Sequence, residues 1–116
     1  FRGYMVYRFL VMQPDLNSHG TLHGGILVKW VDEACGMEAK IQTQSVCATR
    51  YMGDIDFVET ARIGDIVEVV TSLESKGKTS ISYRATVRKV DGTLIANFTN
   101  IVFVAVDKDH KPVHSN

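Results

Sequence analysis

A glycine-rich segment that leads into an apolar stretch carries the residues best suited to acyl-transfer chemistry. Gly24 and Gly25 are adjacent where a helix is expected to begin, so the backbone N–H groups of its first turn have no partner within the helix. Such N–H groups, at the positive end of the helix dipole, stabilise negative charge that develops on a carbonyl oxygen. A tight turn needed only for packing is the alternative explanation of the two glycines.

Asp32, two turns into the same helix, is the candidate for a general base or a nucleophile. On a helical wheel it lies at the edge of the apolar stripe, between Val28 and Gly36. Gly36 removes side-chain bulk beside the carboxylate, at a helix-propensity cost of about 1 kcal/mol, and leaves room for a substrate or a water molecule. The alternative is that Asp32 is a boundary residue that only ties down a neighbouring loop.

One strand, one helix and a succession of strands must position these residues. Apolar residues recur at helical spacing from Gly24 to Lys40, in a stripe formed by Ile26, Leu27, Trp30, Val31, Ala34 and Met37. Strands are expected over residues 3–12, 46–58, 66–74, 80–88 and 94–106, with short turns that make neighbours antiparallel. A single helix with so wide a stripe must be covered by sheet. The predicted fold class is therefore α+β, an antiparallel five-stranded sheet wrapped around one long central helix.

Composition limits the domain count, the partners and the location. The 116 residues predict a single domain, residues 1–116, with a loose C-terminal tail over residues 108–116. Thirteen lysines and arginines balance thirteen acidic residues, so neither nucleic acid nor a membrane surface is an expected partner. Cys35 and Cys47 lack CxxC spacing and fit a reducing cytoplasm, the expected location, and Cys35 falls within the apolar stripe as a core residue.

The order and spacing of these residues resemble the signature of hotdog-fold acyl-CoA hydrolases. The matching segments are Asn17, Gly20, His23-Gly24-Gly25 and Trp30-Val31-Asp32-Glu33-Ala34, followed by Ile55-Asp56-Phe57, Gly64-Asp65 and Gly77-Lys78-Thr79-Ser80. The resemblance covers nearly the whole chain. It implies a hotdog-fold thioesterase that hydrolyses a fatty-acyl-CoA to free fatty acid and coenzyme A. Coenzyme A enters as part of the substrate, and no other cofactor is expected.

The same resemblance implies a homodimer, assembled further into a tetramer or a hexamer, with active sites between subunits. Asp32 of one subunit would face the Asn17 loop and the helix start of the other. In relatives the position of Asn17 helps to orient the water or the substrate carbonyl. The Gly25 N–H would receive the thioester oxygen, while Asp32 acts as general base or as nucleophile. Because both Asn17 and Asp32 are present, a homodimer would supply complete sites.

Substrate-binding residues are expected in the loop before the helix and in a later turn between two strands. Lys78, Thr79 and Ser80 match the family turn that lines the pantetheine and phosphate path of coenzyme A, although a plain polar hairpin turn is the alternative. His23 and Gly24 belong to the substrate-binding loop, where His23 is expected to fix the loop through hydrogen bonds. No metal site is expected, because the loop histidines have no third ligand nearby in the sequence.

Two other functions of the same fold remain as alternatives. A dehydratase acting on hydroxyacyl thioesters requires a catalytic histidine, for which His23 is the only nearby candidate. A non-catalytic acyl-CoA-binding sensor module of a transcription regulator needs a DNA-binding segment, which these neutral residues do not provide unless a preceding segment does. Release of free thiol from acyl-CoA distinguishes an enzyme from a sensor.

Overall fold

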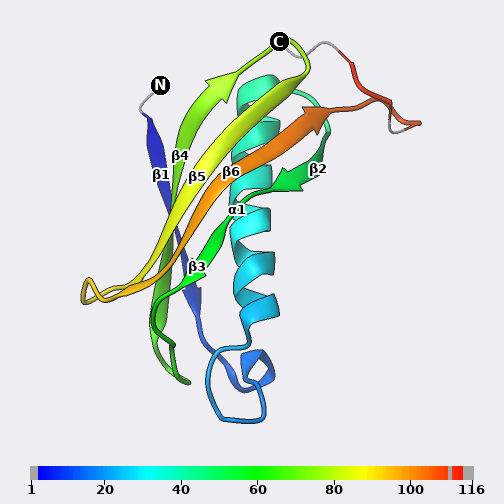
Figure 1. The fold of residues 1–116 in the computed structure, drawn as a ribbon. Helices are drawn as coiled ribbons and strands as arrows, with labels where there is room; N and C mark the ends of the chain where they lie inside the picture. The colour runs from blue at the N-terminus through cyan, green and yellow to red at the C-terminus, as the bar shows by residue number, and fades with distance from the viewer. Residues whose placement is uncertain (1–2, 110, 114–116) are drawn as a thin grey trace.

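A curved antiparallel sheet packs against one long helix in the computed structural model, which describes residues 3–109 and 111–113 (Figure 1). The helix is α1 (Gly24–Thr43), and a short 3-10 turn, η1 (Gln13–Asp15), precedes it. The strands are β1 (Tyr4–Leu10), β2 (Cys47–Met52), β3 (Ile55–Phe57), β4 (Ile66–Lys76), β5 (Ser80–Lys89) and β6 (Leu94–Ala105). Their order is β1-β4-β5-β6-β2, with β3 paired to another part of β6. The predicted class, a helix covered by an antiparallel sheet, is confirmed.

The sheet has six strands rather than the five expected, because the strand predicted over residues 46–58 is divided at Gly53. The N–H of Gly53 donates to the carbonyl oxygens of Thr99 and Asn100, at 3.2 Å each. A Cβ atom on Gly53 would lie 2.8 Å from the Thr99 oxygen, so only glycine fits. Asn100 has a φ of 50°, and β6 changes its partner from β3 to β2 at this point.

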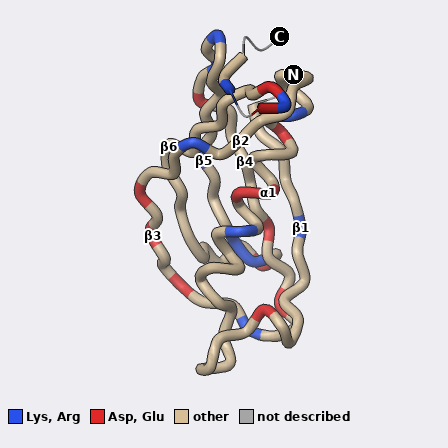
Figure 2. The backbone as a smooth tube through the Cα atoms, turned by 90° about the vertical axis from the view of Figure 1, so that its right-hand side faces the viewer, with Lys and Arg blue, Asp and Glu red and all other residues tan. Residues whose placement is uncertain are grey.

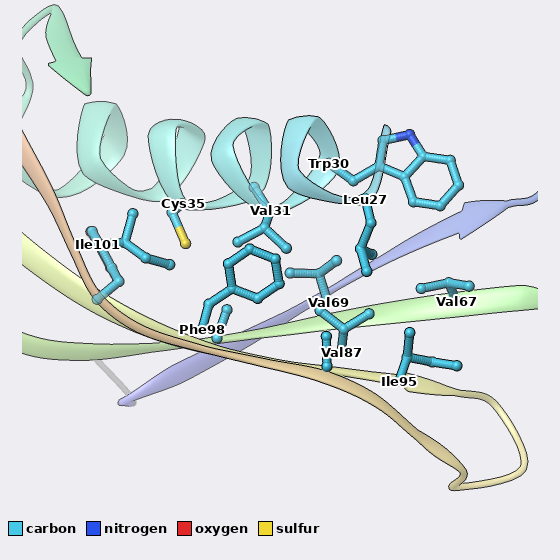
Figure 3. Close-up of a cluster of buried hydrophobic side chains, with 14 of the residues drawn as sticks. Leu27, Trp30, Val31, Cys35, Val67, Val69, Val87, Ile95, Phe98 and Ile101 are labelled. Atoms are coloured by element: carbon cyan, nitrogen blue, oxygen red, sulfur yellow. The ribbon is translucent and has the colours of Figure 1, made fainter. Parts of the chain in front are cut away.

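The core lies between the helix and the inner face of the sheet. Figure 3 shows Val31 and Cys35 of α1 pointing towards Phe98 and Ile101 of β6. The alternation predicted in β5 is confirmed, since its inward side chains are buried: Ile81, Tyr83, Ala85 and Val87. The Trp30 ring stacks on a phenylalanine of β1 at a centroid distance of 4.9 Å, which fixes the first half of the helix against the sheet.

Two helix residues depart from the predicted apolar stripe. Met37 is 45% exposed, whereas Glu38 is only 4% exposed. Glu38 can be buried because it accepts hydrogen bonds from the Tyr7 hydroxyl of β1 and from Nε2 of Gln42 at 3.2 Å. The Tyr83 hydroxyl of β5 donates to Oε1 of Gln42 at 2.8 Å and extends the network. The Tyr7 hydroxyl thus bonds the carboxylate directly and the Tyr83 hydroxyl supports it through Gln42, so Glu38 rather than Met37 is buried.

The ends of the helix and of the chain extend beyond the predicted elements. α1 begins at Gly24 as predicted but ends at Thr43 rather than at Lys40. In the predicted loose tail, the Asp107 side chain accepts from the N–H of Lys111 at 3.0 Å, and the Val113 N–H donates to the Ala105 oxygen at 2.8 Å. The described part of the tail therefore folds back onto β6, while residues 110 and 114–116 lie outside the described residues.

Charged residues of both signs are interspersed along the molecule rather than gathered by sign on one face (Figure 2). This distribution agrees with the balanced composition. The helix of the described chain is not apolar enough over a sufficient length to cross a membrane.

Candidate active site

The helix start is organised by His23, which occupies the N-cap position. Its Nδ1 accepts a hydrogen bond from the Gly25 N–H at 2.8 Å, and its own N–H donates to the Asp15 oxygen at 2.8 Å. A Cβ atom on Gly25 would lie 3.0 Å from the imidazole, so glycine permits this close approach. The amide predicted to receive the thioester oxygen is thus held by His23. The imidazole must turn aside before that N–H can reach a substrate.

Asn17 holds the loop that precedes the helix. Its Oδ1 accepts from the N–H groups of His19 at 2.9 Å and Thr21 at 3.1 Å, while Nδ2 donates to the Thr21 hydroxyl at 3.0 Å. The same side chain lines a cavity of about 210 Å³ together with Gly24 and Phe57. Asn17 therefore shapes its own loop and also faces open space beside the start of the helix.

Asp32 lies on the flank of α1 that faces the edge strand β2. Its Oδ1 accepts a 2.6 Å hydrogen bond from the Thr49 hydroxyl, a short distance typical of a hydroxyl bound to a carboxylate. Both side chains open into a groove of about 510 Å³, which is lined further by Gly36, Cys47 and Phe103. A Cβ atom on Gly36 would lie 3.4 Å from the Phe103 ring. The glycine thus leaves room beside the carboxylate, as the sequence predicted.

Thr49 is the functional candidate that the sequence analysis missed. The residues around it in β2 have neither helical nor strictly alternating hydrophobicity. The short connection from α1 to β2 was a usable signal for Thr49. A strand that directly follows the helix at the sheet edge must run along the flank of that helix. Cys47 and Thr49, two residues apart in that strand, both line the groove that contains Asp32.

Cys35 is not a nucleophile in this arrangement. Its side chain is fully buried, and burial raises the pKa of the thiol to about 12, with the negative charges of Asp32 and Glu38 adding to the effect. The thiol therefore stays protonated near neutral pH and serves as core. Among the described residues, no cluster of three or more His, Cys, Asp or Glu side chains has the arrangement of a metal site.

The predicted site residues lie in three separate places within one subunit. Asn17, His23, Gly24 and Gly25 lie at the N-terminal end of the helix, Asp32 lies partway along it, and the turn of Lys78, Thr79 and Ser80 joins β4 to β5 near its other end (Figure 1). From Gly25 to Asp32 the helix rises by about 10 Å at about 1.5 Å per residue. A thioester carbonyl needs its donors at about 3 Å, so one subunit cannot bring both groups to the same carbonyl.

The fold and this site together define a class of protein. A single long helix with an antiparallel sheet curved around it is the hotdog architecture that the sequence predicts. The family model of the thioesterase superfamily matches residues 19–96. The chain belongs to the thioesterase superfamily, which confirms the expected enzyme class of thioester hydrolase.

Individual relatives give the same family. The acyl-CoA thioester hydrolase YciA of Salmonella typhimurium is 30% identical over 118 residues, which cover 96% of this chain and 89% of that protein. A Deinococcus radiodurans protein named as an esterase is 34% identical over 93 residues, which cover 79% of this chain but only 62% of that protein. The chain thus spans less than two thirds of that second relative.

Solved structures support the fold at the level of the whole chain. The crystal structure of an apo hexameric acyl-CoA thioesterase has a TM-score of 0.86 and 28% identity, and covers 97% of this chain and 74% of that one. The acyl-CoA hydrolase of Staphylococcus aureus, in complex with butyryl coenzyme A and coenzyme A, has a TM-score of 0.81 and 26% identity, and covers 97% and 68%. Variants of the staphylococcal enzyme with an aspartate, an asparagine or a threonine replaced by alanine are also known.

Proposed function

We propose that this protein is an acyl-CoA thioesterase that hydrolyses a fatty-acyl-CoA to free fatty acid and coenzyme A. The observation that carries the proposal is the hydrogen bond from Thr49 to Asp32 at the wall of an open groove. The three residues replaced in the staphylococcal hydrolase have the same order and the same separations along the chain as Asn17, Asp32 and Thr49. The cytoplasm is the proposed location, because Cys35 and Cys47 are both free thiols.

The proposed site lies between two copies of the chain. Because the N–H of Gly25 is too far from Asp32 in one subunit, the partner subunit's Gly25 and the partner subunit's Asn17 complete the site. The edge strand β2 has unpaired backbone groups, and Val46 and Met37 beside it are exposed apolar residues. A homodimer formed along this edge pairs the backbone groups of β2 and covers the two apolar side chains. Further assembly into a hexamer, rather than a tetramer, is favoured by the hexameric thioesterase of similar fold.

The proposed reaction uses the carboxylate of Asp32 in one of two ways. As general base it takes a proton from water while the water oxygen bonds to the thioester carbon. As nucleophile its own oxygen bonds to that carbon, and water later cleaves the mixed anhydride. In both routes the C–S bond breaks, and coenzyme A leaves as a thiolate that takes up a proton. Thr49 holds the carboxylate in position, and the partner's Gly25 N–H, once His23 has turned, stabilises the oxyanion.

The groove beside Asp32 is the proposed position of the acyl chain. It runs past Gly36 and Phe103 towards Met37 and Val46, and its lining is mostly apolar. Asp32 to Lys40 corresponds to about 12 Å of helix at about 1.5 Å per residue. A longer acyl chain buries more methylene groups, each contributing about 0.8 kcal/mol, until the groove ends.

Measuring turnover and melting temperature for the Asp32→Asn variant tests the proposal. The substitution keeps the shape but removes the negative charge, so thiol release from acyl-CoA should fall at least about a hundredfold while acyl-CoA still binds. Asp54→Asn, which changes an exposed carboxylate between β2 and β3, is the matched control and should keep wild-type turnover. If Asp32 only ties down Thr49, its substitution lowers the melting temperature and leaves the rate per folded molecule nearly unchanged, which would sink the catalytic assignment.

The two alternatives have weaker support. The imidazole of His23 is engaged by the Gly25 N–H in the same loop, which disfavours the dehydratase, whose histidine must face an acidic residue. An acyl-CoA sensor would bind the substrate and release no thiol, so the wild-type protein in the same assay separates it from the enzyme.

A further inference from the structure

The groove beside Asp32 carries a positive charge at its far end. Its lining includes Lys40, the basic residue in the last turn of α1. Asp32, Gly36 and Lys40 follow one another at four-residue spacing, so they lie along one flank of the helix. All three line the groove. The groove therefore has a carboxylate at its reacting end and an ammonium group at the other end.

Within one subunit, Lys40 has no anionic partner among the described residues. None of the ion pairs formed within this part of the chain includes it. Glu33, the other acidic residue in the lining, lies about 10 Å from Lys40 along the helix, close to the level of Asp32. The proposed homodimer covers Met37 and Val46, which line the groove together with Lys40, and so removes part of the water around the ammonium group. A cation that loses water gains from an anion in the groove, whereas a lysine in open water needs none.

The rest of the lining suits a chain of methylene groups, since it includes the apolar side chains of Met37, Val46 and Phe103. We propose that the groove accepts acyl groups that end in a second carboxylate, which pairs with the ammonium group of Lys40. The inference rests on the proposed thioesterase function, since it names the class of acyl-CoA that is hydrolysed at that site. The substrate is the coenzyme A monothioester of a dicarboxylic acid, and water cleaves it to the free dicarboxylic acid and coenzyme A. Lys40 does not reach the thioester, so it determines specificity and takes no part in the chemical step.

The positions of the charges set the length of the preferred chain. Asp32 and Lys40 are about 12 Å apart along the helix axis, and helical side chains lean towards the N-terminus, which brings the ammonium group closer to the reacting end. An extended chain advances by about 1.2 Å per bond, so a dicarboxylic chain of about eight carbons spans about 8 Å between its two carboxyl carbons. A chain of about four carbons spans only about 4 Å. Its free carboxylate stays beside Asp32 and Glu33, whose like charges repel it.

The test compares octanoyl-CoA with suberyl-CoA, which has the same chain length and a terminal carboxylate in place of the methyl group. The wild type should cleave suberyl-CoA with a kcat/KM at least equal to that for octanoyl-CoA. Lys40→Met removes the charge and keeps a long side chain that favours helix, so the ratio of the two kcat/KM values should fall about fivefold to thirtyfold, mainly through KM for suberyl-CoA. Lys29→Met, the same change at an exposed lysine of α1 outside the groove lining, should keep the wild-type ratio. Since Lys40 is exposed, its variant should also keep the wild-type melting temperature.

A binding measurement separates this inference from the proposed function. In thioether analogues of the two substrates a methylene group replaces the thioester carbonyl, so the protein cannot cleave them. Titrated in a calorimeter, the analogue with the terminal carboxylate should bind the wild type, and Lys40→Met should weaken its binding about fivefold to thirtyfold relative to the analogue with the terminal methyl group. A wild-type protein that shows this difference but releases no thiol from either thioester refutes the hydrolase and keeps the preference of the groove. A protein that cleaves both thioesters with the same ratio in Lys40→Met and wild type refutes the role of Lys40 and keeps the hydrolase, and the lysine then only complements the helix dipole.

Discussion

Replacing Thr49 with valine removes the hydroxyl that Asp32 accepts and keeps the shape of the side chain. The bond is 2.6 Å long and ends on a carboxylate, and hydrogen bonds to charged groups contribute about 1.5–3 kcal/mol. If that energy holds the carboxylate in its reactive position, kcat falls by about 10- to 150-fold. Thr49 is exposed on an edge strand where valine is well tolerated, so the melting temperature should change little.

The assay is thiol release from acyl-CoA, with kcat, KM and melting temperature measured on the same preparation. Thr49→Ser keeps a hydroxyl and should retain most of the turnover. Thr86→Val, the same change in β5 at a residue whose hydroxyl bonds Asn97, should have no effect on the rate. A Thr49→Val enzyme that keeps more than about half of the wild-type kcat, or a serine variant as slow as the valine variant, would show that the hydroxyl does not position the base.

Two further predictions concern stability and thiol reactivity. Arg8 donates to Glu68 at 2.8 Å, and Arg8 and Arg88 hold the pKa of this carboxyl below its ordinary 4.5. The contribution of Glu68 to the free energy of unfolding is therefore present above about pH 4.5 and is lost as the pH falls through the lowered pKa. The urea midpoint should fall less steeply in acid for Glu68→Gln than for the wild type. Equal pH profiles of the two proteins would contradict this. Burial raises the pKa of Cys35 to about 12, so iodoacetamide at pH 8 should label half-buried Cys47 and should label Cys35 only after the protein unfolds. Peptide mass spectrometry measures the labelling of each cysteine. Labelling of Cys35 in the native state would overturn its placement in the core.

The parts of the site that depend on local sequence were predictable. Adjacent glycines mark where α1 begins, and the helical period places Asp32 and Gly36 on one flank. Thr49 was missed because its contact with Asp32 depends on where an edge strand passes the helix, which no local pattern encodes. The occupation of the Gly25 N–H by His23 also escaped prediction, since it requires the N-cap geometry itself.

The fold shows the same division between local and long-range causes. The helix and the alternation of β5 follow from the periodicity of the sequence. The periodicity does not explain why Glu38 is buried while Met37 is exposed. Burial of Glu38 depends on the Tyr7 hydroxyl, which approaches it from β1, a strand 31 residues away in the sequence, as well as on Gln42 of its own helix. Likewise the break at Gly53 is imposed by the backbone of β6, a contact between distant parts of the chain that no local pattern encodes.

We propose that Asp32 of one subunit works with the partner's Asn17, and mixed dimers distinguish a shared site from two separate ones. Asp32→Asn and Asn17→Ala subunits with different tags are co-expressed in equal amounts, and the assemblies that carry both tags are isolated. A mixed dimer within such an assembly has one site with both residues intact and one site with neither, so it contributes about half of the wild-type turnover, and random pairing of the subunits gives about a quarter overall. Doubly tagged assemblies that are no more active than the two single variants would contradict a shared site.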